Sequence, residues 1–351
     1  MIVAVLVATL FTFDVQHFWG AYAHWSTPDS IASRLATWDS AHYLHLSQDG
    51  YRAGSKSCAF YPLWPGVIGV ASWLTLGHPL VAALLLANGL SLGVFVLFYR
   101  LVQQQYGATT ANDTLILLLA FPGALFFSFP YTESFYLFMV LVFFLELERG
   151  RYLWPGIIGF LMPLTKAIGV FIVLPLAWHL YERKAARKYW LLLLLPLLGY
   201  AAYFGTMGFS TGNPFEGFLA QKEYPNSPSI RNMFDLAGMS DALLDMHSMG
   251  GMMDAFLDRF LFFVFLGLLP WVYRLNKTWF LFAFAAGLVP ALTSWFMSYR
   301  RYFMVCFPLF IVMAQLLQRP KSRIVFWYYV LILAGLQFWA ITRFVNFNWA
   351  G

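Results

Sequence analysis

Residues 80–100 read LVAALLLANGLSLGVFVLFYR, an apolar run that carries no charge before its last residue. A helix rises about 1.5 Å per residue, so a helix of this length is about 30 Å long and matches the hydrocarbon core of a bilayer. Comparable apolar runs cover residues 1–19, 112–129, 133–149, 153–164, 168–182, 189–208, 258–274, 278–297, 301–318 and 324–344. The sequence therefore predicts an all-α polytopic membrane protein with about 11 transmembrane helices.

The composition of the whole chain agrees with this prediction. Of the 351 residues, 60% are hydrophobic and only 11% are charged, whereas soluble domains carry about 25% charged residues. Such a chain cannot cover a globule with polar side chains, which excludes a soluble enzyme, a disulfide-stabilised secreted scaffold and a disordered protein. The two cysteines, Cys58 and Cys306, form no CxxC motif, and we interpret both as packing residues.

The positive charges predict the orientation of the chain in the membrane. Basic residues gather in short loops between apolar runs, where the positive-inside rule is reliable, and this placement indicates no nucleic-acid partner for the net charge of +6. They are Arg100, Arg149, Arg151, Arg183, Lys184, Arg187, Lys188, Arg274, Lys277, Arg319, Lys321 and Arg323. The start Met1–Phe13 lacks a basic flank, so we interpret it as part of the first span and not as a cleaved signal. This scheme places loops 20–58 and 209–257 on the outer face.

The apolar segment 59–77 decides between two topologies. If it crosses the membrane, loop 20–58 lies on the cytoplasmic side with the basic loops. Pro62 and Pro65 stand in its first turns, and Trp64 and Trp73 flank its centre, which is typical of a helix lying near the interface. We therefore predict that it does not cross, and that residues 1–351 form a single transmembrane domain.

The first outer loop holds the densest group of candidate functional residues. A short helix over residues 40–48 would bring Asp39, His42 and Tyr43 to one sector, because successive residues step by 100°. Asp39 could equally be the N-cap of that helix.

Several motifs in this chain resemble those of one enzyme family. They are Trp38–Leu46 (WDSAHYLHL) with Gly50-Tyr51, Phe60–Pro65 (FYPLWP), Phe121–Ala124 (FPGA) with Ser128–Phe135 (SFPYTESF), Leu164–Gly169 (LTKAIG), and Tyr299–Tyr302 (YRRY) with Phe307–Phe310 (FPLF). In this order they resemble the PIG-V family of mannosyltransferases, in the GT-C superfamily of membrane glycosyltransferases. The resemblance runs from about residue 38 to residue 310.

The resemblance implies a function and a set of site residues. It implies an inverting transfer of a sugar, most commonly mannose, from a polyprenyl-phosphate donor to a hydroxyl of a lipid or glycan acceptor, on the non-cytoplasmic face. Asp39 would be the general base, and Lys166, Arg300 and Arg301 would bind the donor phosphate. The remaining substrate-binding candidates are His42, Tyr43, Tyr61, Tyr131 and Glu133. Neither a metal nor another cofactor is expected.

Each candidate also has a plainer interpretation. Lys166 could extend from a helix end to the interface, although it lies between two short apolar runs, where an unpaired charge is costly. Arg300 and Arg301 could be interfacial anchors, Glu133 could cap the following helix, and His42 and Tyr61 could be packing residues. The chain departs from the family's motif at two positions. Lys166 replaces the usual arginine, and Ile168 stands where a polar residue is common.

The short chain, with no Lys-Asp-Glu-Leu ending, predicts a bacterial relative in the inner membrane, with the active site on the periplasmic or extracellular face. A lipid-linked-sugar transporter or flippase is the alternative function, and a non-catalytic lipid-binding subunit is a third.

Methionines in loop 209–257, together with His247, could bind copper or form a flexible apolar surface. They are Met233, Met239, Met246, Met249, Met252 and Met253.

Overall fold

The computed structural model describes residues 30–225, 227–318 and 323–351, so the predicted first span 1–19 lies outside the described residues. Within these ranges the regular structure is helical, apart from one isolated bridge between Ser248 and Ala255. The α-helices are α2 (Ile31–Leu35), α3 (Asp39–Asp49), α4 (Leu63–Ser72), α5 (Pro79–Ala120), α6 (Glu133–Glu148), α7 (Leu153–Leu161), α8 (Val173–Glu182), α9 (Leu194–Thr211), α10 (Glu216–Gln221), α11 (Leu236–Leu244), α12 (Phe256–Leu275), α13 (Lys277–Ser294), α14 (Tyr299–Val305), α15 (Pro308–Leu317) and α16 (Arg323–Val345). The 3₁₀ segments are η3 (Lys56–Ala59), η4 (Trp73–Thr75), η5 (Pro122–Phe127), η6 (Met162–Leu164), η7 (Ala167–Ile172), η8 (Arg187–Leu193) and η9 (Ile230–Phe234).

The all-α membrane class predicted from the sequence is confirmed. Five described helical segments are long and apolar enough to cross a membrane: Pro79–Ala120, Arg187–Thr211, Phe256–Leu275, Lys277–Ser294 and Arg323–Val345. The pair α14 and α15, bent by 79°, would add a sixth. The predicted spans at 153–164 and 168–182 form shorter helices, each partly 3₁₀. The number of 11 crossings stays a prediction.

Helix α5 covers the predicted run 80–100 and the first part of the predicted run 112–129, with a break in the helical backbone between them. At Gly107 the backbone has φ +84°, a left-handed conformation that glycine adopts without steric cost. The chain then returns along itself, because Asn88 Nδ2 donates to Ser128 O at 3.1 Å and Ser91 Oγ donates to Phe127 O at 2.7 Å. The predicted runs 80–100 and 112–129 are therefore the two arms of a hairpin.

The segment 59–77 forms a short helix, α4, and one 3₁₀ turn, η4. Ten residues of α-helix are fewer than the roughly 17–25 that a transmembrane helix needs. The two tryptophans differ in environment, because Trp73 is 83% exposed whereas Trp64 is fully buried. Trp64 therefore packs inside the protein, stacking on Phe135 at 5.5 Å between ring centroids, and only Trp73 has the exposure expected of an interfacial residue.

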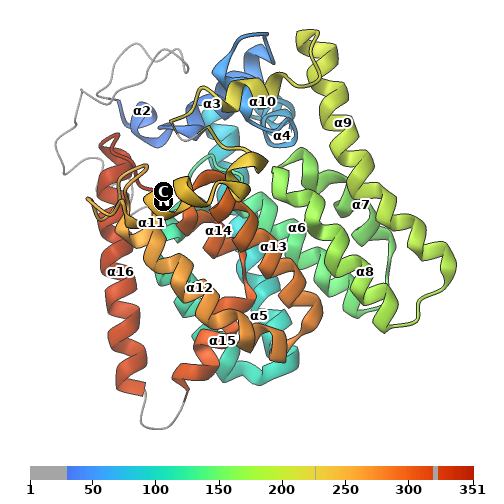
Figure 1. Ribbon diagram of the computed structural model, residues 1–351, viewed down its shortest axis with the longest axis vertical. Helices are drawn as coiled ribbons and strands as arrows, with labels where there is room; N and C mark the ends of the chain where they lie inside the picture. The colour runs from blue at the N-terminus through green and yellow to red at the C-terminus, as the bar shows by residue number, and fades with distance from the viewer. Residues whose placement is uncertain (1–29, 226, 319–322) are drawn as a thin grey trace.

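The bundle has two distinct ends (Figure 1). Helices α3, α4 and α10 gather at one end, where α9 and α16 also finish, whereas α12 meets α13 and α15 finishes at the opposite end. The chain segments of the predicted outer loops therefore lie at one end, and the predicted cytoplasmic turns, with their described basic residues, lie at the other. Which end faces outward stays a prediction.

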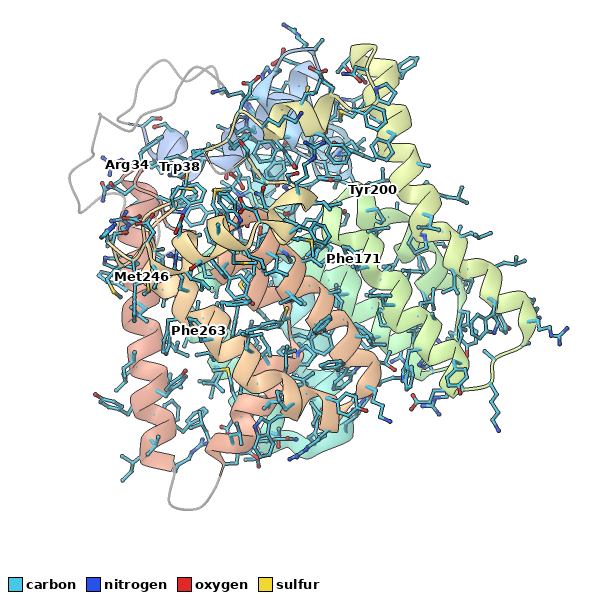
Figure 2. The ribbon with its side chains drawn as sticks, in the orientation of Figure 1. Arg34, Trp38, Phe171, Tyr200, Met246 and Phe263 are labelled. Carbon is cyan, nitrogen blue, oxygen red and sulfur yellow. The ribbon has the colours of Figure 1, made fainter. Side chains whose placement is uncertain are left out.

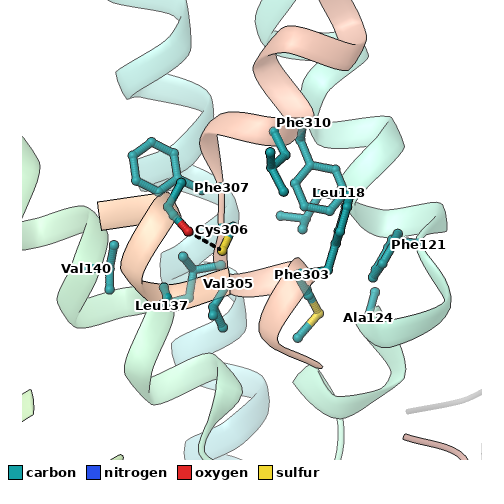
Figure 3. Close-up of a cluster of buried hydrophobic side chains, with 14 of the residues drawn as sticks. Leu118, Phe121, Ala124, Leu137, Val140, Phe303, Val305, Cys306, Phe307 and Phe310 are labelled. Atoms are coloured by element: carbon teal, nitrogen blue, oxygen red, sulfur yellow. Dashed lines mark hydrogen bonds between the residues drawn. The ribbon is translucent and has the colours of Figure 1, made fainter. Parts of the chain in front are cut away.

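A dense aromatic core fixes α14, which carries Arg300 and Arg301 (Figure 3). Phe303 stacks on Phe121 at 5.1 Å between ring centroids, and Phe310 meets the same ring edge-on at 5.4 Å. Cys306 is buried and donates to Ala283 O at 3.6 Å. Close-packed interiors resist displacement, so this core holds α14 against η5.

We expect impermeant labelling to place the end that carries α3 and α10 outside the cell. Cysteines introduced at Ala53 and Ser227, which are exposed, should react with a membrane-impermeant maleimide in intact cells. A cysteine at Lys188, exposed at the start of η8, should react only after lysis. The native Cys58 and Cys306 are buried, so the background should be low. The opposite labelling pattern would contradict the predicted orientation.

Candidate active site

Asp39 is the first residue of α3, and its carboxylate does not cap the helix. The N-cap position is Trp38, and no side-chain cap hydrogen bond forms there. Asp39 Oδ2 instead accepts a hydrogen bond from Arg301 Nη1 at 2.5 Å. The structure therefore gives no support to the N-cap interpretation of Asp39, and its role as general base stays a prediction.

The backbone just before Asp39 is strained. Trp38 has φ +53° and ψ −125°, outside the regions that non-glycine residues usually occupy. Its ring meets that of Trp349 edge-on at 5.1 Å between centroids, near the end of α16 (Figure 2). Such strain costs of the order of 1–3 kcal/mol and persists only where the surrounding structure imposes it. The packing around Trp38 therefore sets the direction of the Asp39 side chain.

Glu133 begins α6 and is fully buried. Its Oε1 accepts hydrogen bonds from Arg301 Nε at 2.7 Å and from Lys166 Nζ at 2.8 Å. Its Oε2 is buried and has no hydrogen-bond partner among the described residues. A carboxylate in the first turn of a helix also interacts favourably with the helix dipole. Glu133 is thus the shared acceptor of two cations and retains one unused oxygen.

Lys166 lies in the break between η6 and η7, where its backbone is extended (φ −151°, ψ 145°). The break folds tightly because Gly169 packs on Met162, where an added Cβ would lie 2.3 Å from the carbonyl carbon. Lys166 Nζ also lies 5.5 Å from the centroid of the Tyr302 ring. A tight turn between two short apolar segments therefore directs the ammonium group inward, toward Glu133.

Arg301 connects the cluster, because one guanidinium bonds to both carboxylates. It also lies over the rings of Tyr131, at 4.7 Å, and Phe126, at 5.1 Å from the ring centroids. We call Asp39, Glu133, Lys166 and Arg301 the charge cluster. Two positive and two negative groups balance, so burial does not leave a net charge. Removing one member of such a buried set typically costs about 3–5 kcal/mol.

The charge cluster is least buried at Asp39. The side chains of Asp39 and Lys166 are 18% and 13% exposed, whereas those of Arg301 and Glu133 are 9% and 0% exposed. A substrate approaching this end of the bundle would therefore meet Asp39 first. The charge cluster thus presents Asp39 and Lys166 on its more exposed side, whereas Glu133 is fully buried.

The predicted aromatic residues lie at different distances from the charge cluster. Tyr131 packs beneath Arg301, and its ring lies 6.5 Å from that of Tyr43. His42 stacks on Phe60 and places Nδ1 2.9 Å from Ser57 Oγ. Burial lowers the pKa of His42 to about 4, so the imidazole is neutral at physiological pH. Tyr43 and Tyr131 therefore line the cluster, whereas His42 packs within the first loop.

Tyr61 lies in a separate group of tyrosines. Its ring stacks on that of Tyr203 at 4.5 Å between centroids, and Tyr203 in turn stacks on Tyr200 at 5.8 Å. Tyr61 is buried within this group. Tyr61 makes none of the ion pairs or hydrogen bonds that define the charge cluster.

The structure does not bring Arg300 into the charge cluster. Arg300 and Asp258 are fully buried and form a fork, with Nε to Oδ1 and Nη2 to Oδ2 both at 3.1 Å. The backbone N–H of Arg300 also donates to Asp258, and Nη1 donates to Ala350 O at 2.8 Å. With every one of these groups engaged, Arg300 is a structural partner of α12 here. Its predicted contact with the donor phosphate stays a prediction.

Asp258 was not singled out from the sequence as a partner for Arg300. It stands in the first turn of an apolar helix, among several acidic residues of the second loop, and nothing local distinguishes it. The next residue of α12, Arg259, donates to the carbonyls of Ala242, Ala255 and Met253 in that loop. Among the described residues, no group of three or more His, Cys, Asp or Glu side chains is placed to hold a metal.

The helical bundle and its charge cluster define an integral, polytopic α-helical membrane protein with a polar site at one end. Residues 25–182 match the family model described as mannosyltransferase (PIG-V), which confirms over this part of the chain the resemblance inferred from the motifs. Asp39, Glu133 and Lys166 lie within the matched region, and Arg301 lies beyond it.

Individual relatives match over shorter or more distant alignments. Over 129 residues the chain is 31% identical to GPI mannosyltransferase 2 of Drosophila pseudoobscura pseudoobscura, an alignment covering 34% of this chain and only 28% of that protein. Among solved structures, the chain is similar to the Archaeoglobus fulgidus oligosaccharyltransferase, with a TM-score of 0.49 and 13% identity over 100% of this chain and 53% of that one.

Proposed function

We propose that the chain is an inverting membrane glycosyltransferase of the GT-C type. It moves mannose from a polyprenyl-phosphate donor to a hydroxyl group of a lipid or glycan acceptor, on the non-cytoplasmic face of a bacterial inner membrane. The match of residues 25–182 to the PIG-V family supports the reaction class. The observation that carries the proposal is the charge cluster, in which a partly exposed carboxylate lies beside two cations.

Asp39 acts as the general base in this proposal. An acceptor hydroxyl is a poor nucleophile, and a carboxylate within hydrogen-bond reach takes its proton as the new bond forms. The acceptor oxygen attacks the anomeric carbon, the bond from this carbon to the phosphate oxygen breaks, and the lipid phosphate leaves with the electron pair. Attack from the face opposite the leaving phosphate inverts the anomeric configuration.

Lys166 and Arg301 stabilise the negative charge that develops on the departing phosphate. Preorganised cations in a site that excludes water lower such a barrier more than they would in bulk solvent. Without donor, both cations are paired with Asp39 and Glu133, which hold them in place at no net charge. A donor phosphate would compete for these pairs, and a shift of Arg301 toward the phosphate would release Asp39 for proton transfer.

Glu133 and the neighbouring aromatic side chains bind the substrates. The unused Oε2 of Glu133 can accept a hydrogen bond from a sugar or acceptor hydroxyl. Tyr43 and Tyr131 present rings beside the cluster that can pack against a sugar face. His42 contributes by packing within the first loop, and Tyr61 by packing in the separate tyrosine group.

Turnover of a defined donor tests the proposed function. Purified protein in detergent should release polyprenyl phosphate from polyprenyl-phosphate mannose and transfer labelled mannose to an extract of membrane lipids or glycans. A flippase would instead move the intact donor across the bilayer of reconstituted vesicles. Movement of the intact donor without release of polyprenyl phosphate in either preparation would overturn the proposal.

A further inference from the structure

A polar cleft lies at the end of the bundle opposite the charge cluster. It has a volume of about 310 Å³ and is formed where the first arm of α5, α6 and α8 end and α13 begins. Its polar lining consists of Gln105, Glu148, His179, Glu182, Arg183, Asn276 and Thr278. Glu133 and Glu148 are the two ends of α6, so at 1.5 Å per residue the cleft is about 22 Å from the charge cluster.

A buried imidazole nitrogen without a partner lines this cleft. His179 is only 5% exposed, and its Nε2 has no hydrogen-bond partner among the described residues. Leaving a buried polar atom unsatisfied costs about 1–3 kcal/mol, so such atoms usually meet a ligand or an ordered water. His179 therefore indicates that the cleft accommodates a polar group.

The other groups around the cleft favour a ligand that donates hydrogen bonds. The carboxylates of Glu148 and Glu182 are acceptors, and Gln105 already donates to Glu148 at 2.7 Å. Helices α6 and α8 both end here, and the last carbonyls of a helix carry partial negative charge. In the first turn of α13, the backbone N–H of Trp279 already donates a hydrogen bond to the Asn276 side chain. The cleft is thus rich in acceptors.

Arg183 adds one cationic group to the lining of the cleft, and it is exposed. A guanidinium group suits a phosphate, whereas the two carboxylates and His179 suit an ammonium group with its three N–H donors. We propose that the cleft binds a primary ammonium group joined to a phosphate. This is the chemistry of an aminophospholipid headgroup, and phosphoethanolamine is its soluble counterpart.

The position of the cleft agrees with a lipid source for this ligand. Helix α6 has 16 residues, about 24 Å at 1.5 Å per residue, which approaches the thickness of the hydrocarbon core. The cleft lies at the same end of the bundle as the predicted cytoplasmic turns, and we infer that it is at headgroup level in the leaflet away from the charge cluster. The site is independent of the proposed sugar transfer.

Thermal unfolding of the delipidated full-length protein in detergent tests this proposal. Phosphatidylethanolamine should raise the unfolding temperature, because a ligand that binds only the folded state stabilises it. Phosphatidylcholine, which carries three methyl groups in place of the ammonium protons, and phosphatidylglycerol, which lacks the nitrogen, should not. Glu148→Gln and His179→Phe should each weaken binding of phosphatidylethanolamine about tenfold or more, as expected for loss of a hydrogen bond to a charged group.

Glu223→Gln, an exposed change at the other end of the bundle, is the matched control and should bind normally. Competition by phosphoethanolamine at equal concentration would support the ammonium site and identify its source as soluble. Equal stabilisation by phosphatidylcholine, or unchanged binding by both variants, would overturn the proposal. If the variants fail to fold, the comparison of headgroups on the unmodified protein still decides the question.

Discussion

Asp39→Asn is expected to lower the rate of mannosyl transfer about 10²–10⁴-fold, because an amide cannot take the proton of the acceptor hydroxyl. The substitution keeps the shape of the side chain, and its amide oxygen can still accept from Arg301. Asp39 does not cap α3, so the helix should form as before. The initial rate of transfer, the affinity for donor and the unfolding temperature should be measured together. Loss of one charge from the cluster should lower the unfolding temperature, but the protein should remain folded and bind donor while the rate of transfer falls steeply.

Asp49→Asn provides the matched control for this experiment. Asp49 ends the same helix, where it pairs with His45 Nδ1 at 2.9 Å, and it has no role in the proposed chemistry. Its substitution should leave transfer unchanged. Near-normal transfer by well-folded Asp39→Asn would remove Asp39 from the mechanism, and Glu133 would be the next carboxylate to examine.

Lys166→Met should lower the turnover number about 10²–10³-fold, the loss typical of removing one electrostatic contact to a developing charge. Glu133 keeps its hydrogen bond from Arg301 in this variant, so the fold should survive. Lys166→Arg should recover part of the rate, since it restores the charge and the PIG-V motif has arginine there. The measurement is the turnover number at saturating donor, with the unfolding temperature as a check on folding.

Lys188→Met removes a lysine that is exposed at the start of η8, and it should leave turnover unchanged. The comparison separates a local electrostatic role from a general effect of positive charge. Normal turnover by Lys166→Met would mean that Lys166 serves only to neutralise Glu133 or to anchor the break between η6 and η7.

Much of the fold could be predicted because apolar runs are a local property. The runs at 80–100 and 112–129 correspond to the two arms of α5, and Gly107 marks the turn between them. The runs at 153–164 and 168–182 form helices of about the predicted lengths, Leu153–Leu164 and Ala167–Glu182, and whether they cross the membrane stays a prediction. The break between these two runs was predicted, but their 3₁₀ segments were not, because hydrophobicity alone does not distinguish 3₁₀ from α-helix.

In the candidate site, the contrast between what the sequence predicts and what the tertiary structure decides is sharper. Arg300 and Arg301 are adjacent, and the sequence offered no reason to prefer one of them. Successive residues of a helix point about 100° apart, so the two side chains reach different neighbours. Packing of α14 between α12 and α6 directs Arg300 to Asp258 and Arg301 to Asp39 and Glu133.

The sequence by itself determined that this is a helical membrane protein, and it identified Asp39, Glu133, Lys166 and Arg301 as candidates through their motifs. Only the tertiary structure decided which of them meet. Arg301 is 262 positions from Asp39 and 168 from Glu133, and Lys166 is 33 from Glu133. Local patterns extend over a few helical turns, whereas contacts across such separations arise only when the helices pack and bring buried charges close enough to neutralise each other.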